Sequence, residues 1–574
     1  MQQREIADVF DQIGDLLELK GENRFRIQAY RRAALNLRGL AENLERLAAA
    51  GELENIPGIG KDLSAKIQEM LATGRLRFLD QLKREVPESL ATLLTIPGIG
   101  PKTAKLVYDK FKVKSIHHLE EIVKSGKLRS LPGFQQKKEE NILRGVQLLK
   151  AGQERMSLGV ALALAEEVLQ SVKKLPGIRR ISFCGSLRRR KETVRDLDLL
   201  ITSDQPAKVM AGFVRLPFVH RVQSHGETKS SIRTKQGVQV DLRVVDPDSF
   251  GAALVYFTGS KEHNIRIRSL ANKMGLTVNE YGVFKIKGNR RVAGREEKDV
   301  YKALGLTWMP PEIREDRGEV EAAQRGTLPG LVEAEQIKGS FHNHSNWSDG
   351  AHSLEEVARA VKAKGYQYML LSDHSQSLRI AGGLSEKDLL RQMEEVRKLN
   401  RRMGSFKILM GSEVDILPDG RLDYPDALLK KLDMVIAAVH SAFKQPKETM
   451  TRRIVKGLKN RYVSILAHPT GRLLGEREPL QVDMEEVCRA AAGSHTALEI
   501  NCCTQRLDLN DVHARQAREA GAKLAVSTDT HVLDQLDSLE LGVAMARRAW
   551  AAPNDVLNTL NLKSLLAWVA RKRG

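Results

Sequence analysis

The spacing of apolar residues changes along the chain, and each change predicts a different kind of structure. Over the first 150 residues, short segments with helical spacing are interrupted by Pro-Gly turns, which predicts a series of short helices. A helical stretch over 157–175 is followed by strand-like segments over 180–184, 196–201 and 238–245. From residue 336 onward, short apolar runs alternate with helical segments, as a (β/α) barrel requires. Residues 310–331 are rich in Pro, Gly, Glu and Arg without an apolar period, so we expect a linker there.

Composition adds a polyanion as a candidate partner. The 574 residues include 92 Lys and Arg against 72 Asp and Glu, a formal charge of +20, and 42% are hydrophobic. This excess suits a groove that holds phosphates, although a generally basic surface explains it equally well. No apolar run approaches the roughly 20 residues of a membrane span, and the N-terminus has no secretion-signal pattern. Four cysteines without a CxxC pair give no disulfide framework. We expect a soluble, cytoplasmic, multidomain protein.

An internal repeat marks the N-terminal part. Residues 55–67 begin Asn-Ile-Pro-Gly-Ile-Gly, residues 95–107 begin Thr-Ile-Pro-Gly-Ile-Gly, and a decayed copy over 130–142 has Gln135 in place of the second glycine. Such a turn ends at a helix whose first N–H groups are free to bind a phosphate. This is the helix-hairpin-helix pattern, which contacts a DNA backbone without reading bases, and the alternative is a purely structural hairpin. The predicted DNA-binding residues are Gly58, Gly60, Gly98, Gly100 and Lys102.

Three carboxylates form the first catalytic constellation. Asp196 and Asp198 share one face of a predicted strand, and Asp241 lies on a second strand that joins them if the strands pair. Two Mg²⁺ ions would offset their repulsion, carry nucleotide phosphates and activate a 3′-hydroxyl for in-line attack. The turn that begins at Gly185 and contains Arg188 is placed to cradle those phosphates.

With these residues, and with the motif Tyr-Phe-Thr-Gly-Ser over 256–260, the chain resembles the family X DNA polymerases, relatives of polymerase beta. The resemblance implies that Asp196 and Asp198 bind both metals and that Asp241 deprotonates or positions the primer hydroxyl. Ser186 and Arg188 would hold the triphosphate; Tyr256 and Phe257 would disfavour a ribose 2′-OH, Asn264 would contact the base edge, and Arg268 the template side. The nucleotide-binding residues so implied are Gly185, Ser186, Arg188, Tyr256, Phe257, Gly259, Asn264 and Arg268.

Lys66 occupies the position of the Schiff-base lysine that removes a 5′-deoxyribose phosphate in the beta-like members of that family. However, Asp62 stands where those members have a phosphate-binding lysine, and its charge would repel the 5′-phosphate. An exposed helix lysine is therefore the favoured interpretation, with a lyase role as the alternative.

The second constellation lies in the C-terminal part, which holds nine of the 14 histidines. A His-x-His pair, His342 and His344, resembles the opening motif of the polymerase-and-histidinol-phosphatase (PHP) family. The ligands that this resemblance implies are His342, His344, Asp349, His374, Glu413, His440, His468, Asp529 and His531. Nitrogen and oxygen ligands without thiolate suit a cluster of Mn²⁺ or Zn²⁺ at one face of a barrel. Glu413 would bridge two ions, a metal-bound water would be the nucleophile, and Glu499 and Asn501 would support the ligands.

Together these features resemble bacterial family X polymerases along the whole chain. We expect helix-hairpin-helix domains over 1–80 and 81–150, an α+β nucleotidyltransferase palm over 151–250, a thumb-like domain over 251–315, a linker over 316–335 and a distorted PHP barrel over 336–574. The resemblance implies a monomer that uses Mg²⁺ or Mn²⁺ to fill gaps in gapped or primed DNA from dNTPs, as in base excision repair. Its barrel would supply 3′→5′ exonuclease activity, with AP-endonuclease or 3′-phosphatase activity as further candidates.

Three alternatives stay open. The first alternative is that the barrel is catalytically inactive and only structural, with or without its metal cluster. The chain is a binding module with vestigial sites, which the filled carboxylate triad argues against. The chain is a small-molecule phosphatase, which leaves the hairpin repeats unexplained.

Overall fold

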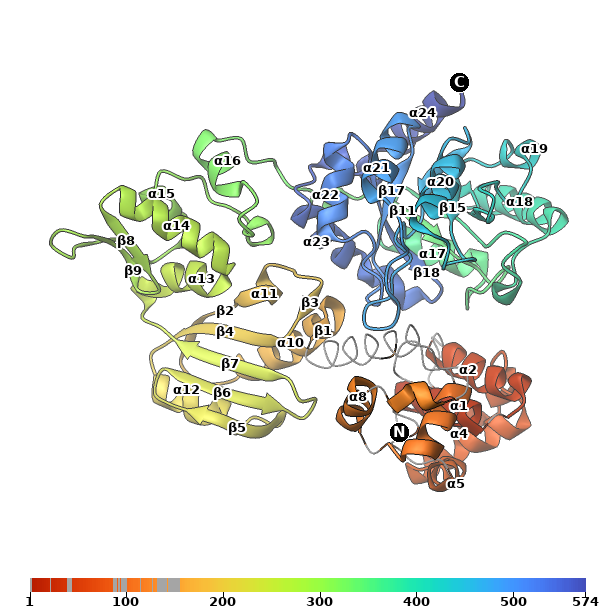
Figure 1. Cartoon of the computed structure of the whole chain (residues 1–574), viewed down its shortest axis with the longest axis horizontal. Helices are drawn as coiled ribbons and strands as arrows, with labels where there is room; N and C mark the ends of the chain where they lie inside the picture. Colours follow the sequence, from red (N-terminus) through yellow and green to blue (C-terminus); the bar gives the residue numbers. More distant parts are fainter. Residues whose placement is uncertain are drawn as a thin grey trace.

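Three groups of elements make up the computed structural model (Figure 1). It describes residues 3–20, 22–38, 44–85, 101–113, 115–125, 127–131 and 155–574, together with the single positions 90, 93 and 142. Most of the third hairpin copy and the glycines of the second copy lie outside the described residues. No helix within the described ranges is both long enough and apolar enough to cross a bilayer.

Short helices form the N-terminal group, as the interrupted helical spacing predicts. They are α1 (Gln3–Lys20), α2 (Arg24–Arg38), α3 (Leu44–Ala50), α4 (Lys61–Thr73), α5 (Arg77–Glu85), α7 (Pro101–Phe111) and α8 (Ile116–Lys124). Their apolar faces share a hydrophobic core of their own, with Phe10, Tyr30 and Ile67 almost fully buried. This group therefore has the core that an independent domain needs.

A mixed five-stranded sheet is the centre of the second group. Its strand order is β2-β4-β7-β6-β5, and only β4 and β7 are parallel to each other. The strands are β2 (Ile178–Phe183), β4 (Asp196–Ser203), β5 (Val219–His225), β6 (Lys229–Thr234) and β7 (Gln239–Val244). Helices α10 (Leu158–Val172) and α12 (Pro206–Phe213) contribute to its apolar core. The three predicted strand segments are thus β2, β4 and β7.

A smaller subdomain follows the sheet. It contains α13 (Phe250–Thr258), α14 (Lys261–Lys273), α15 (Glu297–Ala303) and the antiparallel strands β8 (Leu276–Asn279), β9 (Gly282–Lys285) and β10 (Arg291–Ala293). The segment after it differs from the predicted linker. It includes the helix α16 (Glu319–Arg325), and its residues Ile313, Arg314 and Val320 are buried. Its few apolar residues pack against neighbouring parts, which a search for apolar periodicity over so short a segment does not detect.

Eight parallel strands build the C-terminal barrel, in the order β13-β12-β11-β18-β17-β16-β15-β14. They are β11 (Gly339–Asn343), β12 (Tyr368–Leu371), β13 (Lys407–Met410), β14 (Glu413–Asp415), β15 (Val435–Ala438), β16 (Val463–Leu466), β17 (Ala497–Asn501) and β18 (Leu524–Thr530). The helices between and after them are α17 (Leu354–Ala363), α18 (Glu386–Asn400), α19 (Asp426–Leu429), α20 (Lys447–Leu458), α21 (Met484–Gly493), α22 (Asp511–Glu519), α23 (Leu539–Arg548) and α24 (Leu562–Arg573). A bridge between His374, three residues after β12, and Glu413 in the edge strand β14 draws the two ends of this strand order together.

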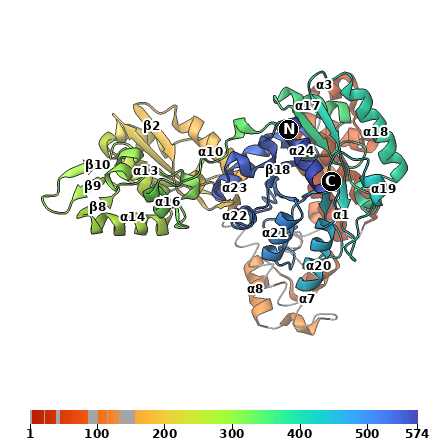
Figure 2. The same cartoon turned by 90° about the horizontal axis from the view of Figure 1, so that it is seen from above.

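The central sheet domain and the barrel share one continuous hydrophobic cluster. Helices α22 and α23 lie on the side of the barrel that faces the central part (Figures 1 and 2). On α10, a Cβ at Gly159 would lie 2.2 Å from Cγ2 of Thr504 in the barrel, so a side chain at this position would force α10 or Thr504 to shift. A large apolar contact of this kind holds two domains in a fixed relation.

Candidate active sites

The three predicted carboxylates meet on the central sheet. Asp196 and Asp198 alternate along β4 and therefore share a face, and the parallel register pairs Asp198 with Asp241 on β7. Asp241 is buried and accepts hydrogen bonds from Ser231 Oγ (2.6 Å) and Gln239 Nε2 (2.9 Å). Two neighbours therefore fix the position of one Asp241 oxygen.

The electrostatics of this triad favour a cation. Burial and the charges of Asp196 and Asp241 raise the pKa of Asp198 to about 6. Lys229 Nζ, 3.3 Å from Asp241 Oδ2, offsets only part of this negative charge. Carboxylate oxygens are the ligands that Mg²⁺ and Mn²⁺ prefer, so the residues fit such ions.

The turn before β4 brings its backbone against Asp198. Gly185 has φ +61°, and a Cβ there would lie 2.6 Å from Asp198 Oδ2. This positive φ and the close approach explain why a glycine begins the short helix α11 (Gly185–Arg188) and precedes Ser186. A cavity of about 690 Å³ opens beside Asp196, lined by α10 and by Arg195 and Arg233.

Arg188 has protein partners in this structure, and its contact with triphosphate stays a prediction. Its guanidinium makes a bidentate ion pair with Glu297 (2.7 and 2.8 Å) and donates to Thr258 Oγ1. Burial alone would raise the pKa of Glu297, but Arg188 and Arg314 outweigh it and hold the pKa at about 2. In this structure Arg188 therefore joins the turn over 185–190, called the phosphate turn below, to α15. A triphosphate that binds Arg188 would have to compete with Glu297 for the guanidinium. Sequence spacing does not reveal a pairing 109 residues apart.

Tyr256, Phe257 and Gly259 lie at the end of α13, and the predicted residues Asn264 and Arg268 follow on α14. The rings of Tyr256 and Phe257 meet edge to face at 5.1 Å, and Asn264 Nδ2 donates to the Tyr256 carbonyl oxygen at 2.7 Å. Arg268 lines an open pocket on the outer surface of α14. Gly259 has φ +69° and ends α13. Arg243, which the sequence reasoning missed, lies 4.4 Å above the Phe257 ring, and its place two residues after Asp241 was the available signal.

Only the first hairpin can be described in full. Gly58 has φ +77°, and Gly60 precedes α4 without a side-chain cap, so the first N–H groups of that helix are not used by a cap. Gly98 and Gly100 lie outside the described residues, and Lys102 belongs to α7.

Lys66 is not the exposed lysine that the sequence analysis favours. Its side chain is 14% exposed, pairs with Asp62 and lies 5.2 Å above the Phe78 ring. Asp62 one turn earlier and Phe78 on α5 enclose the ammonium group, and the contact with Phe78 depends on tertiary packing.

All nine predicted barrel ligands come together at one end of the parallel strands. Four overlapping groups bring ligand atoms within 4.8 Å of one another: His344, Asp349, His374 and His531; His342, Glu413 and His468; His342, His344 and Asp529; His374, Glu413 and His440. Within the described ranges, groups that meet this distance occur only in the barrel. Glu413 belongs to two of these groups, and the two oxygens of its carboxylate would let it serve ions bound in both.

Buried ring nitrogens test whether these residues fit metal ions. In the described part of the chain, Nε2 of His342, both ring nitrogens of His344 and Nδ1 of His374 have no hydrogen bond of good geometry. Buried polar atoms without a partner are costly in a folded protein. They lie instead within ion-pair distance of carboxylates, such as His344 Nε2 and Asp529 Oδ1 at 3.3 Å. Divalent ions between these nitrogens and carboxylates would give both kinds of atom a partner, so the residues fit a metal site.

A second layer of polar residues orients the ligands. Glu499 accepts from His342 Nδ1 at 2.6 Å and from the His468 backbone N–H, and Asn501 Nδ2 donates to Asp529 at 3.0 Å. The sequence reasoning missed Asp415, which lies 2.6 Å from His440 Nδ1. It also missed Asp373, which accepts from the Ser345 N–H and from Ser348 and so holds the loop that carries Asp349. The only signal in the sequence for Asp415 was its position two residues after Glu413.

Charge balance in the barrel depends on its carboxylates. Burial would lower the pKa of His374 and His440, but Glu413 and the neighbouring acids outweigh it and raise these pKa values to about 10 and about 9. Burial and the neighbouring His531 and His374 lower the pKa of His344 to about 3. Ions that bind here must therefore displace protons from some of the ligands.

Segments of the chain match four families. A helix-hairpin-helix domain matches residues 1–76, and a SAM-like helix-hairpin-helix tandem matches residues 90–147. The DNA polymerase beta thumb matches residues 253–315, and the PHP domain matches residues 340–502.

Several known proteins are similar to the chain. The DNA polymerase/3′-5′ exonuclease PolX of Bacillus subtilis is 39% identical over 573 residues, which cover 100% of both chains. A probable phosphatase of Thermoanaerobacter is 31% identical over 229 residues, 38% of this chain and 89% of its own length. DNA polymerase lambda of the rat is 27% identical over 292 residues, 46% of this chain and 48% of its own length.

Proposed function

The chain belongs to the family X DNA polymerases that carry a C-terminal PHP domain, and from this membership we propose that it fills short gaps during base excision repair. It is a DNA-directed DNA polymerase with a 3′→5′ exonuclease activity, so DNA and dNTPs are its substrates. The observation that carries the proposal is that two separate constellations, a carboxylate triad and a nine-residue His and acid cluster, are both complete. We further propose that it works as a cytoplasmic monomer.

At the first site, the residues of the palm hold the reacting groups in line. Asp196, Asp198 and Asp241 would hold Mg²⁺ or Mn²⁺, which when bound neutralises phosphate charge and favours the ionised 3′-hydroxyl. Asp241, fixed by Ser231 and Gln239, orients the primer hydroxyl. Tyr256 and Phe257 pack against the incoming sugar, and the close backbone approach at Gly185 leaves room for phosphates beside Asp198.

At the second site, the nine barrel ligands would hold Mn²⁺ or Zn²⁺, which when bound supply an activated water and stabilise phosphate charge. Glu499, Asp415 and Asn501 keep the ligand side chains in orientation, and burial excludes bulk water from His342 and His344. The match of the barrel to a probable phosphatase supports 3′-phosphatase activity as an additional reaction of this site, and AP-endonuclease activity is a further candidate for the same assay.

A single assay separates the two sites. A duplex with a one-nucleotide gap is incubated with the protein and with Mg²⁺, Mn²⁺ or Zn²⁺ in turn, with and without dNTPs, and products are resolved by length. We expect gap filling with dNTPs and 3′ trimming without them. Asp198→Ala should abolish synthesis and leave trimming, and His344→Ala should do the reverse.

Other outcomes would redirect the proposal. Synthesis without trimming under every metal would indicate a structural barrel. Loss of both activities from either substitution, with the fold intact by circular dichroism, would contradict two separate sites. If a primed template without a downstream strand were extended as efficiently as the gapped duplex, this result would argue against a preference for gaps.

A further inference from the structure

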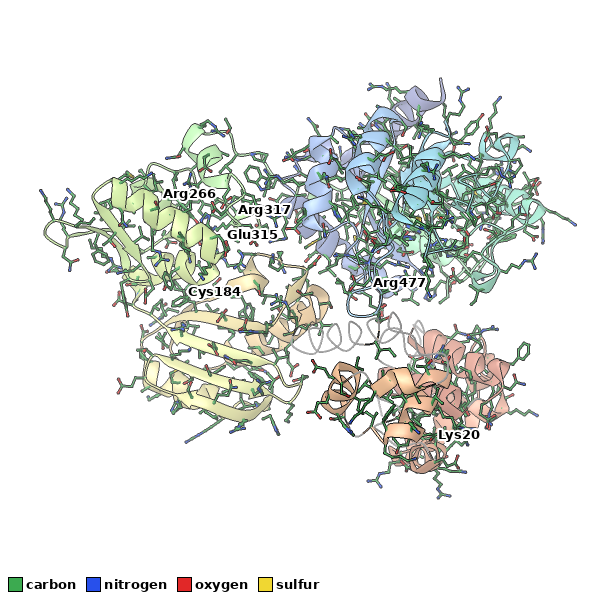
Figure 3. The ribbon with its side chains drawn as sticks, viewed as in Figure 1. Lys20, Cys184, Arg266, Glu315, Arg317 and Arg477 are labelled. Carbon is green, nitrogen blue, oxygen red and sulfur yellow. The ribbon has the colours of Figure 1, made fainter. Side chains whose placement is uncertain are left out.

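Arg548, the last residue of α23, extends from the barrel toward the polymerase part and is 2% exposed. Helix α23 lies on the side of the barrel that faces the palm and thumb (Figure 2). The labelled residues Glu315 and Arg317 lie at the same junction (Figure 3). A buried arginine at a junction between two domains needs a full set of acceptors.

The acceptors of Arg548 come from both parts of the molecule. Nη1 donates to the Arg189 carbonyl oxygen (2.6 Å), to Glu315 Oε1 (3.0 Å) and to the Glu312 carbonyl oxygen (3.3 Å). Nη2 donates to Asp511 Oδ2 (2.6 Å), which belongs to the barrel. A single guanidinium therefore joins the barrel to the palm and to the last residues of the thumb-like segment.

The bond to Arg189 reaches the polymerase site. Arg189 directly follows Arg188 at the end of the turn that begins with Gly185 and Ser186. Its own guanidinium donates to Glu315 Oε1 at 3.1 Å and to the carbonyl oxygen of Thr258, which ends the helix carrying Tyr256 and Phe257. The barrel is thus connected by one hydrogen bond to the turn over 185–190, and through Arg189 by a second hydrogen bond to the end of α13.

The arginines of this network compensate the buried carboxylates of Glu315 and Asp511. Burial would raise the pKa of Glu315, but Arg189, Arg548 and Lys191 outweigh it and keep the pKa below its usual value. Asp511, which also pairs with Arg317 at 3.0 Å, is held in the same way by Arg548 and Arg317. Removing one cation would leave buried carboxylates uncompensated, and the backbone at Arg189 would lose its fixed donor.

We propose that Arg548 is a positioning residue of the polymerase site, by which the PHP barrel holds the phosphate turn over 185–190 and the end of α13 in the geometry that dNTP binding needs. The inference rests on the proposed polymerase site and makes the barrel a structural part of it. It does not depend on whether the barrel is catalytically active.

Steady-state gap filling with the full-length protein tests this. Arg548→Met removes the donors at similar volume, and Arg548→Lys restores a charge without the planar fork. Arg547→Met is the matched control, because the neighbouring arginine on α23 binds Glu312, Glu333 and the Val332 carbonyl oxygen but not the phosphate turn. Glu315→Gln tests the network from the other side.

For Arg548→Met we expect the KM for dNTP to rise about tenfold to a hundredfold, the range that a small displacement of binding groups produces. The melting temperature of the joined palm and barrel should fall, because buried carboxylates lose their partner, but the exonuclease rate, assayed well below that temperature, should change little. Arg548→Lys should recover part of the loss, Glu315→Gln should raise KM less, and Arg547→Met should leave KM unchanged.

Two results would overturn the inference. An unchanged KM in both Arg548→Met and Glu315→Gln would show that the network does not position the turn. Equal loss of synthesis and trimming in Arg548→Met and Arg547→Met, in step with melting temperature, would show a general structural role. Because the unsubstituted protein is assayed alongside, failure of the inference is distinguishable from failure of gap filling itself.

Discussion

Single residues in the palm control how closely the backbone approaches the reacting groups. Gly185 combines a left-handed backbone conformation with a position where a Cβ would touch Asp198 at 2.6 Å. Any side chain there must move either the turn or the carboxylate. The effect of a substitution should therefore exceed the backbone strain alone.

We predict that Gly185→Ala lowers the rate of primer extension about a hundredfold, because Asp198 would be displaced. The same substitution should leave 3′ trimming unchanged. Gly275→Ala is the control, since Gly275 has φ +72° but nothing within 4 Å of its Cβ position. It should cost only the roughly 1–2 kcal/mol of left-handed strain. Equal extension rates in the two variants would contradict the prediction.

Glu297 is the residue whose ionisation stabilises the joint between palm and thumb. Its pKa lies at about 2 in the folded protein, against 4.5 ordinarily, because ion pairs with Arg188 and Arg314 outweigh the burial that would raise it. For an acid with a depressed pKa, the stabilisation is complete above the unfolded pKa and is lost as pH falls through the folded pKa.

Glu297→Gln should therefore lower the free energy of unfolding by about 3 kcal/mol at pH 7, and the deficit should shrink as pH falls from 4.5 toward 2. Urea unfolding of both proteins across this pH range measures it. Fluorescence is a suitable readout because Trp308 Nε1 donates to Glu297 at 3.3 Å. A deficit that is independent of pH would indicate that packing, and not charge, is responsible.

At the scale of elements, the first hairpin places an uncapped helix N-terminus at the start of α4. Gly60 is in an extended conformation, and its Cβ position is free of neighbours, so a capping side chain fits there. This separates the two interpretations of the hairpin. A capping carboxylate would stabilise the helix but would repel a DNA phosphate.

We predict that Gly60→Asp weakens binding to gapped DNA about tenfold at low salt, while α4 becomes no less stable. Gly60→Ala adds neither a cap nor a charge and should retain most of the affinity, since nothing lies within 4 Å of the Cβ position. Fluorescence anisotropy over a range of salt concentrations measures both variants. Equal affinities for the two would favour a purely structural hairpin.

Elements with a strong pattern were predictable from the sequence, and contacts between elements were not. The strands β4, β7 and β18 follow directly from alternating or continuous apolar runs, and their registers bring predicted ligands together. The bidentate pair of Arg188 with Glu297 and the position of Lys66 over Phe78 depend on tertiary packing. Arg548 had no local signal, because arginines in the last turn of an amphipathic helix, such as the pair Arg547 and Arg548, are ordinarily surface residues.

At the scale of the whole molecule, one apolar cluster joins the palm to the barrel, whereas the N-terminal helices have a separate core. Domains that share a core unfold together. A ligand that binds the folded barrel should therefore stabilise the palm as well.

We predict that Mn²⁺ raises the unfolding temperature of palm and barrel together. At a hundredfold excess over its dissociation constant, one bound ion contributes about 2.7 kcal/mol, and the N-terminal transition should stay in place. Differential scanning calorimetry with and without Mn²⁺ measures this, with His344→Ala as the control that shifts less. Separate palm and barrel transitions, of which only one responds, would contradict a shared core.

The glycine at position 159, pressed against Thr504, has a consequence for proofreading. Because the palm and the barrel also share one apolar cluster, neither catalytic site can move toward the other. A mispaired primer terminus must then move from the first site to the second, either by melting from its template or by dissociating and rebinding. Editing should consequently accelerate with mismatches that fray easily, and its rate should follow the mobility of the nucleic acid.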